Sequence, residues 1–239
     1  MNHTKLLAKL GACQDAIDWY AEKDSQEAWE SCERGDWLLW IAAHLGVDKT
    51  LLILAARDFA STAIATAPTG SLLHEALHTV GRWACGQANM DAVRDAAEKA
   101  AERAAKLAVI ADAAFATLSA SASAYHVAAV HGRDASPTLN DTAHVVARMA
   151  STFTRTAADT RAAMAAASAT KAATYGDAVF LRCSESFLNS LIDAAWYADS
   201  SCGGYVSAAI VRRKIPWTLI HDAIANYTSE GNTNDPNNT

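Results

Sequence analysis

The sequence predicts an all-α protein, a single bundle of about eight to ten helices. Only four prolines and eleven glycines interrupt its 239 residues, and several segments between them are longer than a typical strand. Alanine, which has the highest helix propensity, dominates the middle of the chain. No linker divides the chain, so we expect one domain over residues 1–228. The segment 229–239 lacks apolar residues and is expected to be a disordered tail.

Capping signals set the helix boundaries in the first half. Asp24 and Glu27 form a capping box, which predicts a short helix. Asp36 is expected to cap the next helix, and Gly46 stands in the usual C-terminal glycine position. Asp48 caps the helix that follows. The expected helices of this half are 24–32, 36–45, 48–65 and 71–86.

The second half is richer in alanine and has longer expected helices. Asp91 opens a helix to about residue 130, and its first half carries opposite charges four residues apart, which is typical of a solvated face. Those pairs are Arg94/Glu98, Asp95/Lys99 and Glu102/Lys106. Asn140 opens a helix to about residue 173. Further helices are expected at 177–199, from Tyr205 to before Pro216, and from there to about Tyr227, with a loop at 200–204.

Composition excludes several classes of protein. The formal net charge is -6 and the basic residues are dispersed, so we expect no nucleic-acid partner, although a small anionic ligand stays open. Five cysteines without a CxxC pair predict neither a disulfide framework nor a thiolate zinc site. The most apolar run, 51–56, is cut by Arg57 and Asp58, which excludes a membrane span. We therefore expect a cytoplasmic protein with reduced thiols.

Residues 74–78 read His-Glu-Ala-Leu-His, an HExxH match on an expected helix. In a zinc hydrolase the two histidines bind the metal and the glutamate activates a water molecule. The extended form of the motif requires a third histidine at residue 84, which is alanine. Glu98 or Glu102 could supply a third ligand, but both already fit the charged face. We interpret the motif as a chance match, and expect no metal, no cofactor and no catalytic residue.

An aromatic and charged cluster is the second candidate site. Trp37, Trp40 and His44 share one helix face at positions i, i+3 and i+7. Such a stripe usually belongs to a core, with Arg34 pairing with Asp36 or with a carbonyl. The alternative is a pocket that stacks a planar ligand or anchors a partner protein. The full cluster is Trp29, Cys32, Arg34, Asp36, Trp37, Trp40 and His44.

Arg212, Arg213 and Lys214 form the only run of three basic residues, just before Pro216. Cations at a helix C-terminus interact favourably with its dipole, so a solvated helix end explains the run. A contact with phosphate or with an acidic surface is the alternative.

The segment 27–60 resembles an immunity-protein family of bacterial polymorphic toxin systems that also occurs in phage genomes. The matching positions are Trp29, Cys32, Arg34, Asp36, Trp37, Leu39, Trp40, Gly46, Val47 and Asp48. Weaker matches occur at 82–86, 92–105 and 211–216, and the resemblance is carried mainly by residues 13–105. The chain departs from the family pattern after residue 110.

The resemblance implies a non-enzymatic binding protein of microbial conflict that neutralises a toxin or effector protein by occlusion. The negative chain suits a basic partner such as a nuclease toxin. One alternative is a phage-type protein that sequesters a small nucleotide immune signal without cleaving it, and another is an HExxH hydrolase. Small-residue helix faces are compatible with a homodimer as well as with an internal bundle. The candidate binding residues are Trp29, Arg34, Asp36, Trp37, Trp40, His44, Trp83, Arg212 and Arg213.

Overall fold

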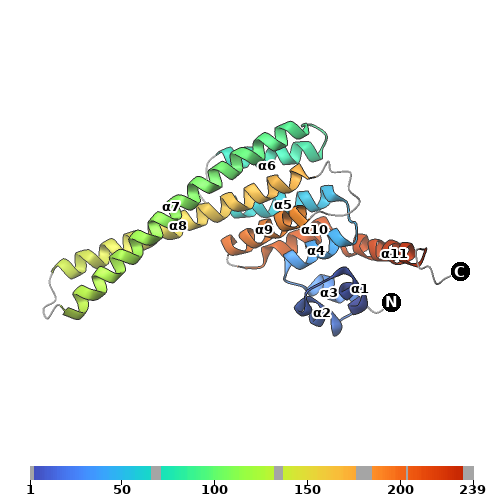
Figure 1. Cartoon of the computed structure of the whole chain (residues 1–239), viewed down its shortest axis with the longest axis horizontal. Helices are drawn as coiled ribbons and strands as arrows, with labels where there is room; N and C mark the ends of the chain where they lie inside the picture. The colour runs from blue at the N-terminus through green and yellow to red at the C-terminus, as the bar shows by residue number, and fades with distance from the viewer. Residues whose placement is uncertain (1–2, 66–70, 132–136, 176–184, 203, 234–239) are drawn as a thin grey trace.

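The computed structural model describes residues 3–65, 71–131, 137–175, 185–202 and 204–233 (Figure 1). Over these residues the chain forms eleven α-helices and no strand, so the predicted all-α bundle is confirmed. The helices are α1 (His3–Leu10), α2 (Gln14–Ala21), α3 (Ser25–Ser31), α4 (Gly35–His44), α5 (Lys49–Ala65), α6 (Ser71–Ala84), α7 (Met90–His131), α8 (Pro137–Thr174), α9 (Glu185–Cys202), α10 (Val206–Lys214) and α11 (Trp217–Thr233). Two short helices, α1 and α2, raise the number above the expected eight to ten.

Helix α5 lies at the centre of the body and contacts α6, α8, α9 and α10. These neighbours cover several faces of α5, and its side chains Leu52, Ile53 and Phe59 are completely buried. Helices α7 and α8 pair along their length as a hairpin that projects well beyond the other helices (Figure 1). The body therefore forms around α5, and the hairpin extends from it.

Alanine is abundant because α8 packs at close range. The following alanines of α8 are fully buried: Ala162, Ala163, Ala165, Ala166, Ala169, Ala172 and Ala173. Helices α5, α6, α7 and α9 all contact this helix. Small side chains shorten the distance between helix axes, so four neighbouring helices can pack closely around α8 without leaving voids.

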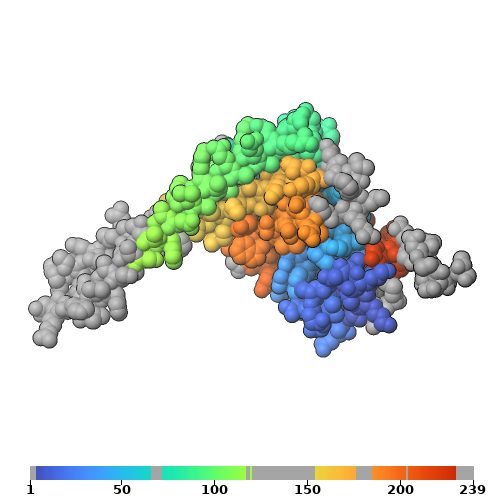
Figure 2. Space-filling view, viewed as in Figure 1, coloured from blue at the N-terminus to red at the C-terminus, as the bar shows by residue number. Residues whose placement is uncertain are grey.

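The N-terminal helices join the same core. Leu6 and Leu7 of α1 and Ile220 of α11 belong to one continuous buried cluster with the residues of α5 and α8. The Lys9 ammonium lies 5.6 Å from the ring centre of Tyr227, which ties α1 to α11. Figure 2 shows α1–α4, in blue, forming a continuous surface with α9, in orange.

Several capping predictions are confirmed. The backbone N–H of Glu27 donates to Asp24 Oδ1 at 2.8 Å and starts α3. Asp48 Oδ1 accepts from the backbone of Thr50 at the start of α5. Gly46 ends α4 with a φ of +78°, in the left-handed region that favours glycine.

Two capping predictions are wrong. Helix α4 begins at Gly35 with Arg34 at the N-cap position, so Asp36 lies inside the first turn and does not cap the helix. Asn89, and not Asp91, accepts the backbone N–H of Ala92 at the start of α7, at 3.0 Å. The sequence favours Asp equally at the cap and in the first turn, because both positions place negative charge near the free N–H groups.

Helix ends also differ from expectation in the second half. Helix α8 already begins at Pro137, since proline is well suited to the first helical position. Helix α9 continues through Cys202, so most of the expected loop at 200–204 is helical. Helix α11 runs to Thr233, into the segment expected to be disordered. The expected start of a helix at 177 lies outside the described residues, as do residues 234–239.

Two further features are the apolar character of the helices and the state of the cysteines. In the described part of the chain, no helix combines the length and the apolar character that a membrane span requires. Cys13, Cys32, Cys85 and Cys202 are free thiols, whereas Cys183 lies outside the described residues.

Candidate functional site

Arg34, Asp36 and Trp37 form a compact group at the start of α4. The Arg34 guanidinium binds Asp36 with two hydrogen bonds, Nε to Oδ1 at 2.9 Å and Nη2 to Oδ2 at 2.6 Å. The same guanidinium lies 4.7 Å from the ring centre of Trp37, within cation–π range. Its side chain is nevertheless 48% exposed. The bidentate bond raises the pKa of Arg34 above its ordinary value, so this group stays charged.

A cavity of about 480 Å³ opens beside this group, and we call it the polar cavity. Its lining residues come from α4, α9 and the segment before α10: Arg34, Asp36, Trp196, Asp199, Ser200, Gly204 and Tyr205. Trp196 and Tyr205 are each 60% exposed. Exposed large aromatic side chains at the edge of a recess are typical of binding sites, because burying them on association releases free energy.

Asp199, the second carboxylate of the polar cavity, is hydrogen-bonded to the start of α10. Its Oδ1 accepts the backbone N–H of Ser207 at 2.9 Å, and its Oδ2 accepts the Ser207 hydroxyl at 2.6 Å. These bonds fix the N-terminus of α10. Burial raises the pKa of Asp199, and the negative charge of Asp36 raises it further, against the lowering effect of the Ser207 hydrogen bonds. Asp36 and Asp199 therefore place excess negative charge in one recess.

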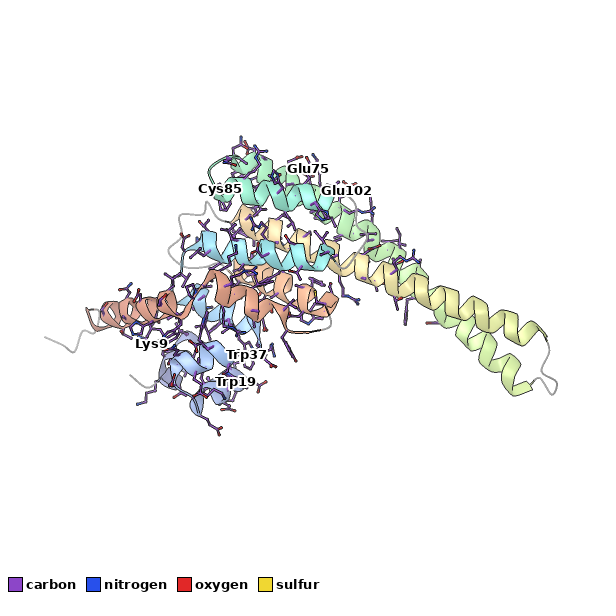
Figure 3. All side chains as sticks on the ribbon, turned by 180° about the vertical axis from the view of Figure 1, so that it is seen from behind. Lys9, Trp19, Trp37, Glu75, Cys85 and Glu102 are labelled. Atoms are coloured by element: carbon purple, nitrogen blue, oxygen red, sulfur yellow. The ribbon has the colours of Figure 1, made fainter. Side chains whose placement is uncertain are left out.

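A second cavity, of about 300 Å³, shares Asp36 with the polar cavity, and we call it the apolar cavity. It is lined by Gly11, Ala12, Cys13, Ala16, Asp36, Trp37, Trp40, Ile41 and Ile192. Figure 3 shows Trp37 on the same side of the body as Trp19, near the N-terminal helices. The two recesses therefore lie next to each other, with Asp36 at their boundary.

The structure separates the predicted cluster into site and core. Trp37 and Trp40 are partly buried and reach the apolar cavity. His44 packs on Trp40 with ring centres 3.9 Å apart, and its Nδ1 lies 2.9 Å from the Trp40 carbonyl oxygen. Trp29 is only 1% exposed and belongs to the core. Trp83 lies on α6 and lines neither recess.

The basic run of α10 makes contacts within the protein. Arg212 Nη1 donates to the Cys32 carbonyl oxygen at 2.6 Å, at the C-terminal end of α3. Arg213 and Lys214 bind Asp58 Oδ2 at 3.3 and 3.0 Å. None of the three lines the polar cavity. The sequence offered a solvated helix end or an anion contact as explanations of this run. Neither explanation includes the contacts that these side chains make with α3 and α5 inside the protein.

The HExxH residues lie on the exposed surface of α6. His74, Glu75 and His78 are all exposed, and the described residues hold no group of three side chains that could bind a metal ion. Glu102 is paired with Lys106 at 2.6 Å. Figure 3 shows Glu75 and Glu102 on the side of the body opposite Trp37, so this motif is remote from both cavities.

The sequence did not single out Trp196, Asp199 and Tyr205. Trp196 and Asp199 are three residues apart, a spacing that places both on one face of α9. That signal was available in the sequence. The sequence gives no sign that these residues lie near Arg34 and Asp36, because 160 or more residues of chain separate the two groups. The contact between α4 and α9 brings them together.

Comparisons of the chain with protein-family models, with curated proteins and with solved structures find no match. The resemblance to immunity proteins therefore stays a prediction.

Proposed function

We propose that the protein is a non-enzymatic cytoplasmic binding protein that neutralises a basic toxin or effector protein by covering its functional surface. The polar and apolar cavities form the contact surface. Arg34, Asp36 and Trp37 contribute from the N-terminal end of α4, and Trp196 and Tyr205 contribute from the other side. The first three were already singled out by the family resemblance.

The observation that carries this proposal is the exposure of Trp196 and Tyr205 beside two carboxylates. Exposing a tryptophan ring to water is unfavourable in free energy, because most of its surface is apolar. Tryptophan and tyrosine are also enriched among the residues that contribute most to binding energy in protein interfaces. The chain has a formal net charge of -6, which favours association with a basic protein through long-range attraction.

Nucleotide sequestration is less well supported. A nucleotide pocket needs unpaired cations or free helix N-termini for its phosphates. The N-termini of α4 and α10 beside the polar cavity already carry the carboxylates of Asp36 and Asp199. Arg34 is already bound to Asp36, and Arg212 to the Cys32 carbonyl. The carboxylates of the polar cavity would repel phosphate. A metal-dependent hydrolase lacks support in the described residues, since His74 and His78 have no third ligand beside them.

The experiment is a neutralisation assay against a panel of basic toxin domains from polymorphic toxin systems. Each toxin is expressed in bacteria with and without this protein, and growth is measured. The wild-type protein is expected to restore growth against at least one toxin and to inhibit that toxin at one-to-one stoichiometry after purification. Trp196→Ala is expected to weaken the complex by roughly 30-fold, as for an interface hot spot.

Ile110→Ala is the matched control, because Ile110 is 52% exposed on α7, outside both cavities. This variant should neutralise as well as the wild type. Stabilisation by an intact nucleotide in a thermal-shift panel, with no toxin neutralised, would overturn the proposal in favour of nucleotide sequestration. Turnover of any candidate ligand would overturn it in favour of an enzyme.

A further inference from the structure

The polar cavity combines an aromatic rim with a negatively charged interior. Trp196 and Tyr205 are exposed at its edge, and Asp36 and Asp199 lie in its lining. We propose that this cavity receives a positively charged side chain, an arginine or a lysine, from the protein partner. The inference rests on the proposed function and specifies which chemical group of the partner is recognised.

The charge of the lining favours a cation. Two carboxylates and one guanidinium line the cavity, which leaves one net negative charge. The Arg34 charge is matched by Asp36 through two hydrogen bonds. Asp199, in contrast, receives hydrogen bonds only from neutral groups, Ser207 and the backbone of Val206. An incoming guanidinium or ammonium group therefore meets a carboxylate whose charge these bonds do not cancel.

The rim favours the same kind of group. A cation over the face of tryptophan or tyrosine is attracted by the negative face of the ring, most strongly where water is excluded. The Trp196 ring contacts the Tyr197 ring edge-on, with ring centres 5.0 Å apart and planes at 78°. Because Tyr197 packs against the core, this contact restricts the orientations open to the Trp196 ring. A ring restricted in this way loses less conformational freedom on binding.

The adjoining apolar cavity favours a protein as the source of the cation. It measures about 300 Å³, and Trp37, Trp40 and Ile192 contribute apolar surface to its lining. The polar cavity beside it measures about 480 Å³, enough for a long side chain. A polypeptide that carries a basic residue near an apolar residue can fill both recesses at once. A free small cation leaves the apolar recess unused.

The test uses short peptides as probes, so that it does not depend on the identity of the partner. Acetyl-Arg-Leu-amide, acetyl-Lys-Leu-amide and acetyl-citrulline-Leu-amide are titrated into 15N-labelled protein, and the indole N–H signals are followed by NMR. Citrulline has nearly the shape of arginine but no charge. We expect the two charged peptides to shift the Trp196 signal and the citrulline peptide to bind roughly tenfold more weakly.

Two variants locate the effect. Asp199→Asn keeps an oxygen acceptor for the Ser207 backbone and removes the charge, and should weaken arginine-peptide binding by roughly tenfold. Tyr205→Ala removes an exposed ring with no role in the core and should also weaken binding. Asp91→Asn changes the net charge of the protein equally, at an exposed site on α7, and should leave binding unchanged.

The possible results distinguish a failure of the cation site from a failure of the proposed function. Equal affinity for the arginine and citrulline peptides, or no shift of the Trp196 signal by any peptide, would overturn the cation site. If a toxin were still neutralised in that case, the proposed function would stand without this inference. Charge-dependent peptide binding without neutralisation of any toxin would support the cation site and overturn the proposed function.

Discussion

Gly35 shows how a single residue sets the distance between two helices. It is buried at the first position of α4, where a Cβ atom would lie 2.6 Å from the backbone nitrogen of Ala208 on α10. The structure shows that the absence of a side chain lets α4 and α10 touch, between two residues that line the polar cavity, Arg34 and Asp36.

Gly35→Ala is therefore expected to destabilise the protein by about 1–3 kcal/mol, because the added methyl group forces two backbones apart. Chemical denaturation followed by tryptophan fluorescence measures the change. Gly204→Ala is the control, since no atom lies within 4 Å of its Cβ position, and it should change the free energy of unfolding by less than about 0.5 kcal/mol. Equal effects of the two substitutions would contradict the explanation.

Asp58 is a second residue whose role depends on tertiary contacts. It binds Arg57 at 2.6 Å, Lys214 at 3.0 Å and Arg213 at 3.3 Å, and its side chain is only 15% exposed. Burial by itself raises the pKa of Asp58, but the hydrogen bonds from Arg57 and Lys214 outweigh it and lower the pKa below its ordinary value of 3.8. The carboxylate therefore joins α5 to α10.

A lowered pKa in the folded state means that Asp58 stabilises the protein above about pH 4, where the unfolded chain is already ionised. That contribution is lost as the pH falls through the lowered folded-state pKa. Asp58→Asn should reduce stability at pH 7 by roughly 1–2 kcal/mol and flatten the loss of stability below pH 4. Denaturation midpoints at a series of pH values test this. Asp95→Asn, at an exposed pair, should leave the profile unchanged.

Among the helices, α3 is the clearest case of an element held by a distant residue. It contains only seven residues, too few to be stable alone. Asp24 caps its N-terminal end from the local sequence. Arg212 reaches the carbonyl oxygen just beyond its C-terminal end from α10. A residue that the sequence offered as an anion site therefore completes a helix end.

Arg212→Ala should lower the free energy of unfolding by about 1.5–3 kcal/mol, because a buried carbonyl loses a charged donor. Hydrogen exchange should accelerate most at the amides of α3. Arg213→Ala is the neighbouring control, since that side chain is 67% exposed and its loss should cost less than about 1 kcal/mol. If Arg213→Ala were the more damaging change, the assignment of roles would be wrong.

In the part of the chain whose burial the structure describes, one continuous cluster of buried residues runs from Leu6 in α1 to Ile220 in α11. The N-terminal helices close one side of it, and α8 packs its alanines against the central helix α5. This continuity positions the site, because its residues come from α4, α9 and the start of α10. A destabilising change in the N-terminal helices should therefore lower the free energy of unfolding of the whole body.

Leu7→Ala tests this continuity. Leu7 is 3% exposed, so its truncation should cost about 2–5 kcal/mol. If the core unfolds as one unit, slow amides of α9 should exchange faster by the same free energy as those of α1. Lys5→Ala, at an exposed position of the same helix, should have little effect. Faster exchange confined to α1–α3 would show that these helices unfold separately.

The sequence by itself determined the helical class, the Asp24 and Asp48 caps and the glycine end at Gly46. It also offered Arg34, Asp36 and Trp37 as candidate binding residues. These features depend on neighbours along the chain, whose geometry a helix fixes through its period. Tertiary structure alone decided that Trp29 is core, that Arg212 supports α3, and that Trp196, Asp199 and Tyr205 complete the site. Such pairings join residues far apart in sequence, and their contacts depend on how whole helices pack, which no local pattern encodes.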